Sequence, residues 1–277
     1  MKLGQHFLIN NSVARKIVAA LEIKSNDVVI EIGAGHGELT AALNYELRIK
    51  NNGKIIAIEK DKKLIAQLQK RFAAGKNIKI IEGDVLKILQ DLCSRFQDLS
   101  FKIVGNIPYY LTGYLLRLIS ELKQKPALCV FTVQKEVAER ITASPPRMNK
   151  LAASVQFWAN PEIIGFIPKE NFMPAPKVDS AIIKLIPHTK KTTTIISQLY
   201  LNSSEINYYK TINVLFRQPR KTILNNLRTV NNELKIMKEE IVKKLAEIGI
   251  NPQARPQNLS VGDIVKIANC FINELKS

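Results

Sequence analysis

The sequence predicts a doubly wound α/β fold followed by a smaller helical domain. Short β-rich segments alternate with amphipathic segments over the first half of the chain, as expected for strands and helices that alternate around a parallel sheet. The first of these strands ends in a glycine-rich turn, and acidic or amide residues follow the next three. Beyond about residue 204 only helical patterns are found.

The predicted elements follow in order from the N-terminus. Asn11 and Ser12 can cap a helix over 11–21, with apolar residues on one face, and a β-rich run follows at 28–32. The next segments are a helix at 38–49, a strand at 55–59, a helix at 61–73, strands at 78–81 and 101–105, a helix at 112–122, a strand at 128–133 and a helix at 134–143. Right-handed crossovers make such a sheet doubly wound, and its ligands bind beyond the carboxyl ends of the strands.

The pattern changes late in the chain. Residues 189–198 are polar and show neither a helical nor a strand period, so we place a domain boundary there. This gives a catalytic, cofactor-binding domain at 1–187 and a helical domain at 188–277. Helical patterns are predicted at 204–217, 221–229, 233–247 and 260–274, the last with a capping box formed by Ser260 and Asp263.

Composition favours a polyanionic partner. The 277 residues carry a formal net charge of +17, spread over both predicted domains, which suits nucleic acid first and an anionic membrane second. The three cysteines are far apart and the three histidines are scattered, so we expect free thiols and no metal site. Without an apolar signal peptide or membrane span, we expect a soluble, cytoplasmic protein. We also expect it to be a monomer.

The glycine-rich turn predicts a nucleotide-type site. Gly33, Gly35 and Gly37 directly follow a strand and open a helix, and Glu59 ends the next strand, where an acid can hold both hydroxyls of a ribose. The spacing G-x-G-x-G differs from the dinucleotide fingerprint G-x-G-x-x-G. Acidic residues beside the loop, Glu31 among them, suit the sulfonium cation of S-adenosylmethionine better than a pyrophosphate.

Two further strand ends carry polar groups. Asp84 could accept a hydrogen bond from the adenine of a cofactor, although such a residue can equally be a helix cap. The segment from Gly105 to Tyr110 reads Gly-Asn-Ile-Pro-Tyr-Tyr. The Asn106 side-chain oxygen and a main-chain carbonyl near Ile107 or Pro108 could together accept both protons of an aromatic amino group. Pro108 would fix the loop, and Tyr109 would offer a face for stacking.

These motifs resemble those of the rRNA adenine dimethyltransferases of the KsgA family. Four segments carry the resemblance besides the glycine loop: Gly4–Leu8, Asn106–Tyr109, Phe172–Ser180 and Phe216–Thr222. The resemblance implies a Rossmann-like class I methyltransferase sheet. It also implies transfer of methyl groups from S-adenosyl-L-methionine to the 6-amino groups of two adjacent adenines, in a hairpin near the 3′ end of small-subunit rRNA. The expected partner is therefore small-subunit rRNA within the pre-30S ribosomal particle, with a role in ribosome biogenesis.

The resemblance also implies roles for individual residues. Cofactor contacts are expected from His6, Leu8, Gly33, Gly35, Glu59, Asp84 and Asn106. Phe172 would stack on the target base opposite Tyr109, beside Asn106 and Pro108. We further expect a basic RNA-binding surface between the two domains, formed by Arg140, Arg147, Arg217, Arg220 and Lys221. The chain departs from the family pattern at residues 148–154, at Tyr110 and at Pro219, which affects RNA-facing positions more than the cofactor site.

Three alternative functions remain open at the level of the sequence. An Erm-type methylase shares the fold but modifies large-subunit rRNA, and the segments Phe172–Ser180 and Phe216–Thr222 weigh against it. A non-catalytic assembly factor would not need the intact segment Asn106–Tyr109. A dehydrogenase is disfavoured by the glycine spacing.

Overall fold

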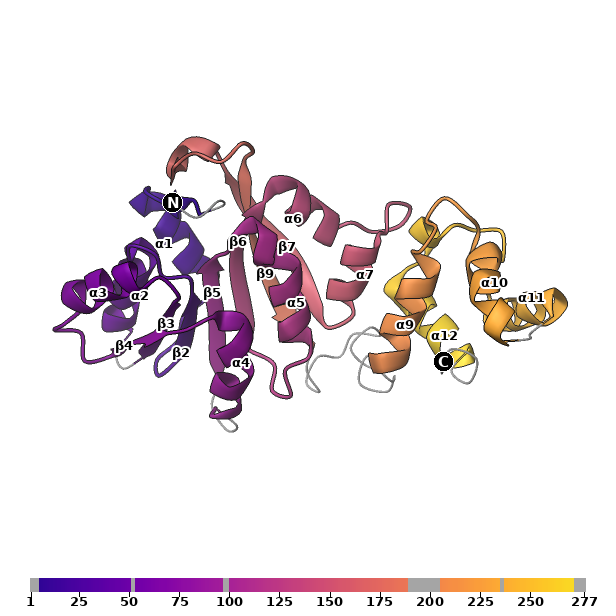
Figure 1. The fold of residues 1–277 in the computed structure, drawn as a ribbon, viewed down its shortest axis with the longest axis horizontal. Helices are drawn as coiled ribbons and strands as arrows, with labels where there is room; N and C mark the ends of the chain where they lie inside the picture. The colour runs from indigo at the N-terminus through magenta and orange to yellow at the C-terminus, as the bar shows by residue number, and fades with distance from the viewer. Residues whose placement is uncertain (1–4, 51–52, 97–99, 189–204, 235–236, 272–277) are drawn as a thin grey trace. The chain divides into compact units, whose positions relative to one another are not determined.

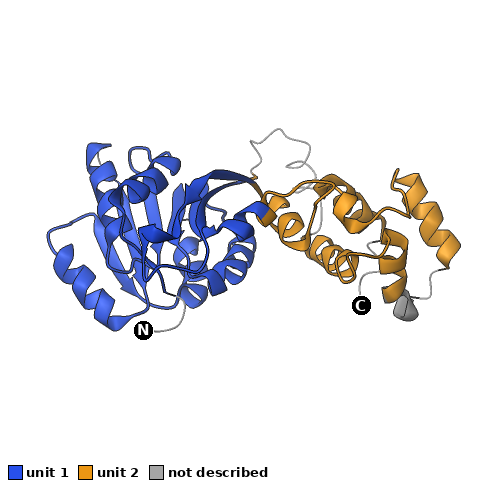
Figure 2. Ribbon diagram, turned by 90° about the horizontal axis from the view of Figure 1, so that it is seen from above, with its two compact units in different colours: residues 1–139, 161–187 blue, residues 140–160, 188–277 orange. Residues whose placement is uncertain are grey.

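The computed structural model describes residues 5–50, 53–96, 100–188, 205–234 and 237–271. The chain divides into two compact units (Figure 2). The first contains residues 1–139 and 161–187, and the second contains residues 140–160 and 188–277.

A seven-stranded sheet forms the centre of the first unit, in the order β4-β3-β2-β5-β6-β9-β7 (Figure 1). Its parallel strands are β2 (Val28–Ile32), β3 (Lys54–Glu59), β4 (Ile78–Glu82), β5 (Phe101–Asn106) and β6 (Leu128–Gln134). These strands and the α/β class confirm the prediction. The sheet is mixed, however, because β9 (Ser180–Pro187) runs antiparallel to β6 and β7 (Ala159–Ile167) follows at the edge.

Helix α1 (Asn11–Ala20) precedes the parallel strands and α6 (Lys135–Ile141) follows them. The strands are connected by α2 (Glu38–Ile49), α3 (Lys62–Arg71), α4 (Val85–Ser94), and the 3-10 turn η1 (Tyr109–Leu111) with α5 (Thr112–Ser120). Alternate strand residues face α1 and α2: Val29, Ile55 and Val104 share one buried cluster with Ile17 and Leu43. This burial of apolar surface on both α1 and α2 fixes them against one face of the sheet.

The strand register places the carboxyl ends of four strands at one rim. Ile32 at the end of β2 lies beside Ile58 of β3 and Gly105 of β5. Glu59 at the end of β3 lies beside Glu82 of β4. The polar residues that follow these strands therefore converge, as the sequence predicts.

The second unit is helical and has its own core. It contains α7 (Lys150–Gln156), α9 (Glu205–Leu215), α10 (Ile223–Leu234), α11 (Lys238–Glu247), the turn η3 (Pro256–Asn258) and α12 (Val261–Cys270). Helix α9 packs against α7, α10 and α12. The predicted capping box is present, since Asp263 N–H donates to Ser260 Oγ at 3.1 Å and the Asp263 carboxylate accepts from Ser260 N–H at 3.0 Å.

The division of the chain differs from the predicted boundary at residue 188 in one segment. Residues 140–160 belong to the second unit, because Phe157 stacks on Tyr208 with ring centroids 3.8 Å apart and Ala153 shares the helical core. Their apolar pattern does not reveal which core they join. The polar segment 189–198, on which the predicted boundary rests, lies outside the described residues.

A buried ion pair joins strand starts at the opposite end of the sheet. Lys102 Nζ lies 2.7 Å from Asp27 Oδ2, and both side chains are less than a tenth exposed. The same ammonium donates to the Glu22 carbonyl at 2.6 Å, and Lys24 N–H donates to Asp27 Oδ2 at 2.7 Å. The charges are thus satisfied by each other and by backbone groups, which burial of a charge requires.

Replacing Lys102 with methionine should lower the free energy of unfolding by about 3 kcal/mol, because Asp27 would be left buried without its counter-charge. Urea denaturation followed by circular dichroism measures the change. Lys54→Met is the matched control, since Lys54 is exposed at the start of β3 and should tolerate the change. Equal unfolding midpoints for both variants would show that the buried pair contributes nothing specific.

Candidate functional site

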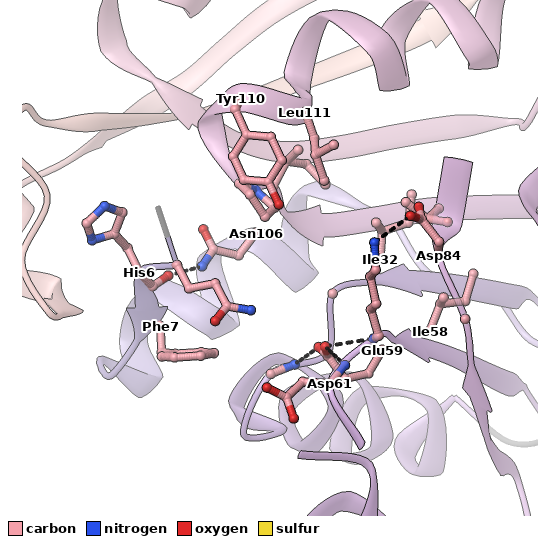
Figure 3. Close-up of a pocket in the computed structure, with 18 of the residues that line it drawn as sticks. His6, Phe7, Ile32, Ile58, Glu59, Asp61, Asp84, Asn106, Tyr110 and Leu111 are labelled. Carbon is pink, nitrogen blue, oxygen red and sulfur yellow. Dashed lines mark hydrogen bonds and ion pairs between the residues drawn. The ribbon is translucent and has the colours of Figure 1, made fainter. Parts of the chain in front are cut away.

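A cavity of about 390 Å³ opens at the rim of the first unit (Figure 3). Its walls come from segments 5–7, 58–62, 83–85 and 106–111, together with Ile32, Gly33 and Gly35. The predicted site residues among them are His6, Gly33, Gly35, Glu59, Asp84, Asn106, Pro108 and Tyr109. His6 is tied to a segment 168 positions away in the sequence, because its Nδ1 donates a hydrogen bond to the Pro174 carbonyl at 2.7 Å.

The glycine loop forms one wall by close approach of the backbone. Gly33 N–H donates to the Ile58 carbonyl at 2.8 Å, which ties the loop to β3. Gly35 has a φ of 59°, and a Cβ atom there would lie 3.0 Å from the Phe7 ring. The site therefore needs glycine at position 35 for both backbone conformation and space.

Glu59 holds this loop and the next one together. Its Oε2 accepts from Gly35 N–H at 2.9 Å, while its Oε1 accepts from Lys60 N–H at 2.8 Å and from Asp61 N–H at 2.9 Å (Figure 3). The carboxylate is 6% exposed and faces the cavity. A carboxylate has roughly four acceptor sites. Oε1 uses two of them and Oε2 uses one, so Oε2 can still accept a hydroxyl donor from a ligand.

Asp84 is both a helix cap and a wall of the cavity. Its Oδ1 accepts from Leu86 N–H at 3.1 Å at the start of α4, and its Oδ2 lies 2.7 Å from Lys60 Nζ. The hydrogen bond from Lys60 holds the pKa of Asp84 below its usual value, and the same contact raises the pKa of Lys60. Asp84 is therefore a carboxylate at neutral pH, able to accept a hydrogen bond inside the cavity.

Asn106 is held with its amide in a defined direction. Its Nδ2 donates to the His6 carbonyl at 2.7 Å (Figure 3). Among the described residues no donor reaches its Oδ1 or the carbonyl of Ile107. The preceding residue must be glycine, because a Cβ atom on Gly105 would lie 2.6 Å from the Ile32 carbonyl. Two acceptors thus remain available beside one another at the end of β5.

Tyr109 stands next to this pair of acceptors. Its hydroxyl shares a hydrogen bond of 2.8 Å with Ser180 Oγ, and burial raises the pKa of the phenol. The His6 ring stacks near Tyr109 at 5.6 Å between centroids, inclined by 30°. The phenol is therefore neutral and fixed in position, with aromatic surface at the cavity.

Phe172 and Leu8 are not brought to the cavity. The short strands β1 (Phe7–Leu8) and β8 (Phe172–Met173) pair antiparallel, with Leu8 opposite Phe172. Both side chains are at most 5% exposed and lie in the apolar cluster under α1. Neighbouring strand residues point to opposite sides, so Phe7 reaches the cavity and Met173 is exposed instead. In this structure Phe172 is part of the apolar core and does not line the cavity.

The five predicted RNA-contacting residues all belong to the second unit. Arg140, Arg147, Arg217, Arg220 and Lys221 are each exposed. None of them forms an ion pair with an acidic side chain in the described part of the chain. Their charges are therefore available on the surface of this unit.

Sequence reasoning did not single out Lys60 and Phe7, although both line the cavity. Lys60 is the first residue after β3, so its place beyond a strand end could have predicted that it lies at the site. Phe7 depends on the pairing of β1 with β8, which local patterns do not reveal. Within the described ranges, no group of His, Cys, Asp or Glu side chains could hold a metal ion, and no helix is long and apolar enough to cross a membrane.

A buried carboxyl group lies beneath the glycine loop. Glu31 in β2 is 1% exposed, and its Oε2 accepts from Thr40 Oγ1 of α2 at 2.6 Å. Its Oε1 has no hydrogen-bond partner among the described residues. Burial raises its pKa to about 8, and the nearby Glu38 and Glu59 contribute in the same direction. Glu31 is therefore largely protonated at neutral pH.

Nearly the whole chain matches one protein family. Residues 1–273 match the model of the family described as ribosomal RNA adenine dimethylase. A curated relative from Dehalococcoides mccartyi, named ribosomal RNA small subunit methyltransferase A, is 40% identical over 96% of this chain and 86% of its own length.

Solved structures show the same fold. A dimethyladenosine transferase from Plasmodium falciparum is 25% identical with a TM-score of 0.78, covering 97% of this chain and 98% of its own. The 23S rRNA methyltransferase ErmE is 20% identical with a TM-score of 0.70, covering 96% and 99%.

The raised pKa of Glu31 predicts that stability falls as the pH rises. The unfolded chain loses this proton near pH 4.5 and the folded protein near pH 8, so the folded state holds the extra proton between these values. The free energy of unfolding should therefore decrease by roughly 4 kcal/mol across this window.

Urea denaturation at pH 5 and pH 8 measures this loss. Glu31→Gln, which stays neutral, should lose far less, whereas Glu121→Gln on the exposed end of α5 should behave as the wild type. If wild type and Glu31→Gln had the same pH dependence, a neutral Glu31 would be ruled out.

Proposed function

This chain belongs to the ribosomal RNA adenine dimethylase family, and from that premise we propose that it dimethylates the 6-amino group of adenine in small-subunit rRNA. S-adenosylmethionine would be the methyl donor. The observation that carries the proposal is the end of β5, where Asn106 Oδ1 and the Ile107 carbonyl remain available as acceptors beside the cavity of the glycine loop.

The cavity residues fit S-adenosylmethionine. Glu59 Oε2 offers an acceptor for a ribose hydroxyl, and Asp84 offers a charged acceptor for the adenine amino group. The glycine loop brings backbone to the cavity without side chains in the way. When bound, this cofactor supplies an activated methyl group on a sulfonium centre. The acidic residues Glu59, Asp61 and Asp84 suit its positive charge.

The acceptor pair would activate the target amine by geometry. The lone pair of an adenine amino group is delocalised into the ring, so the group is a weak nucleophile. Asn106 Oδ1 and the Ile107 carbonyl would each accept one N–H and hold both protons out of the ring plane. The nitrogen lone pair would then be localised and directed at the methyl group. The hydrogen bond from Asn106 Nδ2 to the His6 carbonyl keeps the amide in the required orientation, which supports catalysis by positioning.

Tyr109 would hold the extruded base. Base-modifying enzymes take the target nucleotide out of its helix and stack it on an aromatic side chain. The hydrogen bond of Tyr109 to Ser180 fixes the ring, and Pro108 restricts the backbone before it. Because the Tyr109 phenol is neutral, no charged group loses its water when the base stacks on the ring.

Small-subunit rRNA is favoured over large-subunit rRNA as the substrate. The relative at 40% identity is named for the small subunit, whereas the likeness to ErmE at 20% identity concerns the fold. The finer assignment comes from the family resemblance: the target would be two adjacent adenines near the 3′ end of this RNA, within a pre-30S particle. The enzyme would act as a monomer. The five exposed basic residues of the second unit would supply contacts to phosphates.

Methyl transfer to isolated ribosomal subunits tests the function. Unmethylated small and large subunits are incubated in parallel with radiolabelled S-adenosylmethionine, and the labelled RNA is mapped with nucleases. Dimethyladenine in small-subunit RNA is expected. Label in large-subunit RNA alone would replace the proposal with an Erm-type activity, and no label in either would leave a non-catalytic factor.

Asn106→Ala in the same assay tests the acceptor pair. Transfer should fall by at least about a hundredfold, because one of the two groups that orient the amine is lost. Asn11→Ala, on the exposed first turn of α1, is the matched control and should retain activity. Wild-type turnover by Asn106→Ala would refute the acceptor mechanism while leaving the substrate assignment intact.

A further inference from the structure

Two exposed tyrosines lie one helical turn apart beside the cavity. Tyr110 in η1 is 64% exposed and Tyr114 in α5 is 70% exposed. Leu111 and Thr112 between them both have right-handed helical dihedrals, so the helix continues from η1 into α5. Residues four apart on a helix are neighbours on one face, with Cβ atoms roughly 5–6 Å apart. The two phenol rings therefore extend from the same side of this segment.

The fold does not account for these rings. In the described part of the chain, neither hydroxyl takes part in a hydrogen bond and neither ring packs on another aromatic ring. The surface between them is also open, since a Cβ atom on Gly113 would meet nothing within 4 Å. Single exposed apolar residues are ordinary, but here two large rings at helical spacing are both exposed over an open backbone.

This surface is continuous with the cavity. Tyr110 is one of the cavity-lining residues, and Figure 3 shows its ring on the side of Asn106. The Lys60 ammonium lies close enough to Tyr110 to interact with it electrostatically. Lys87, exposed in the first turn of α4, interacts in the same way with Asp84. Positive groups thus adjoin both the cavity and the aromatic surface.

We propose that Tyr110 and Tyr114 form a stacking platform for the nucleotide next to the target adenine in a single-stranded segment of the RNA substrate. The proposal rests on the proposed function, because it takes the cavity to hold the target base. When an adenine leaves its stack to enter the cavity, the adjoining base loses one stacking partner and lies beside the cavity entrance. An aromatic face there replaces the lost contact, and it tolerates any base because every base has a π-face. The exposed Lys87 would face the phosphates.

Binding of an RNA hairpin with two adjacent adenines in its loop tests the platform. In the presence of S-adenosylhomocysteine, Tyr114→Ala should weaken RNA binding by roughly 5- to 150-fold, the range found for one stacked base. Affinity for S-adenosylhomocysteine itself should not change, because Tyr114 does not line the cavity. Tyr114→Phe should bind RNA as the wild type does, since the ring is kept.

Two controls separate stacking from other causes. Tyr114→Leu keeps an apolar side chain without a flat face and should behave as Tyr114→Ala. Tyr45→Ala removes an equally exposed ring (66%) from α2, which is not part of the cavity, and should leave RNA binding intact. Wild-type RNA affinity of Tyr114→Leu would show that apolar contact without a flat ring is enough, and would overturn stacking as the basis of the interaction.

An abasic nucleotide identifies the base that stacks. Removing the base on one side of the target adenine should weaken binding by the wild type about as much as Tyr114→Ala does. In Tyr114→Ala the same abasic RNA should lose little more, because the interaction is already absent. If the losses of affinity from Tyr114→Ala and from the abasic nucleotide add up, whichever side of the adenine carries that nucleotide, the platform is overturned.

The two proposals fail in different ways. If wild-type protein labels small-subunit rRNA but Tyr114→Ala binds RNA normally, the platform is refuted and the proposed function stands. If wild-type protein labels no RNA, the proposed function fails first.

Discussion

One buried carboxylate determines the arrangement of the site. Glu59 receives three backbone N–H groups, from Gly35 on one loop and from Lys60 and Asp61 on the next. Hydrogen bonds to a charged acceptor are roughly twice as strong as neutral ones, and the low exposure of Glu59 increases their effect. Together with the hydrogen bond from Gly33 N–H to the Ile58 carbonyl, this carboxylate holds the glycine loop close to the cavity.

The other polar groups at the rim are also held in place by hydrogen bonds or ion pairs. Asp84 caps α4 with one oxygen and pairs with Lys60 through the other. Asn106 is fixed by the His6 carbonyl, which itself is placed by the pairing of β1 with β8. Each group is held by at least one contact and lines the cavity. A site built this way is oriented before its ligands arrive, which is how positioning contributes to the rate of a reaction.

The sequence predicts the parts of the site that follow from local pattern. Gly33, Glu59 and Asn106 each follow or end a predicted strand. Because the carboxyl ends of parallel strands lie at the same edge of a sheet, this pattern predicts that the three residues share one rim. The parts that depend on distant pairing could not be predicted: Phe172 is buried because a two-residue strand meets β1 across the chain. Residues 140–160 join the helical core for a related reason, because an apolar pattern shows that a segment is buried but not against what.

The central claim is that Glu59 organises the cofactor site, and a titration of S-adenosylhomocysteine measures it directly. Glu59→Gln replaces one acceptor oxygen with an amide that cannot accept, so affinity should fall by at least about tenfold. Glu82→Gln, at the corresponding end of the neighbouring strand and exposed, should bind as the wild type. Unchanged affinity of Glu59→Gln would contradict the account.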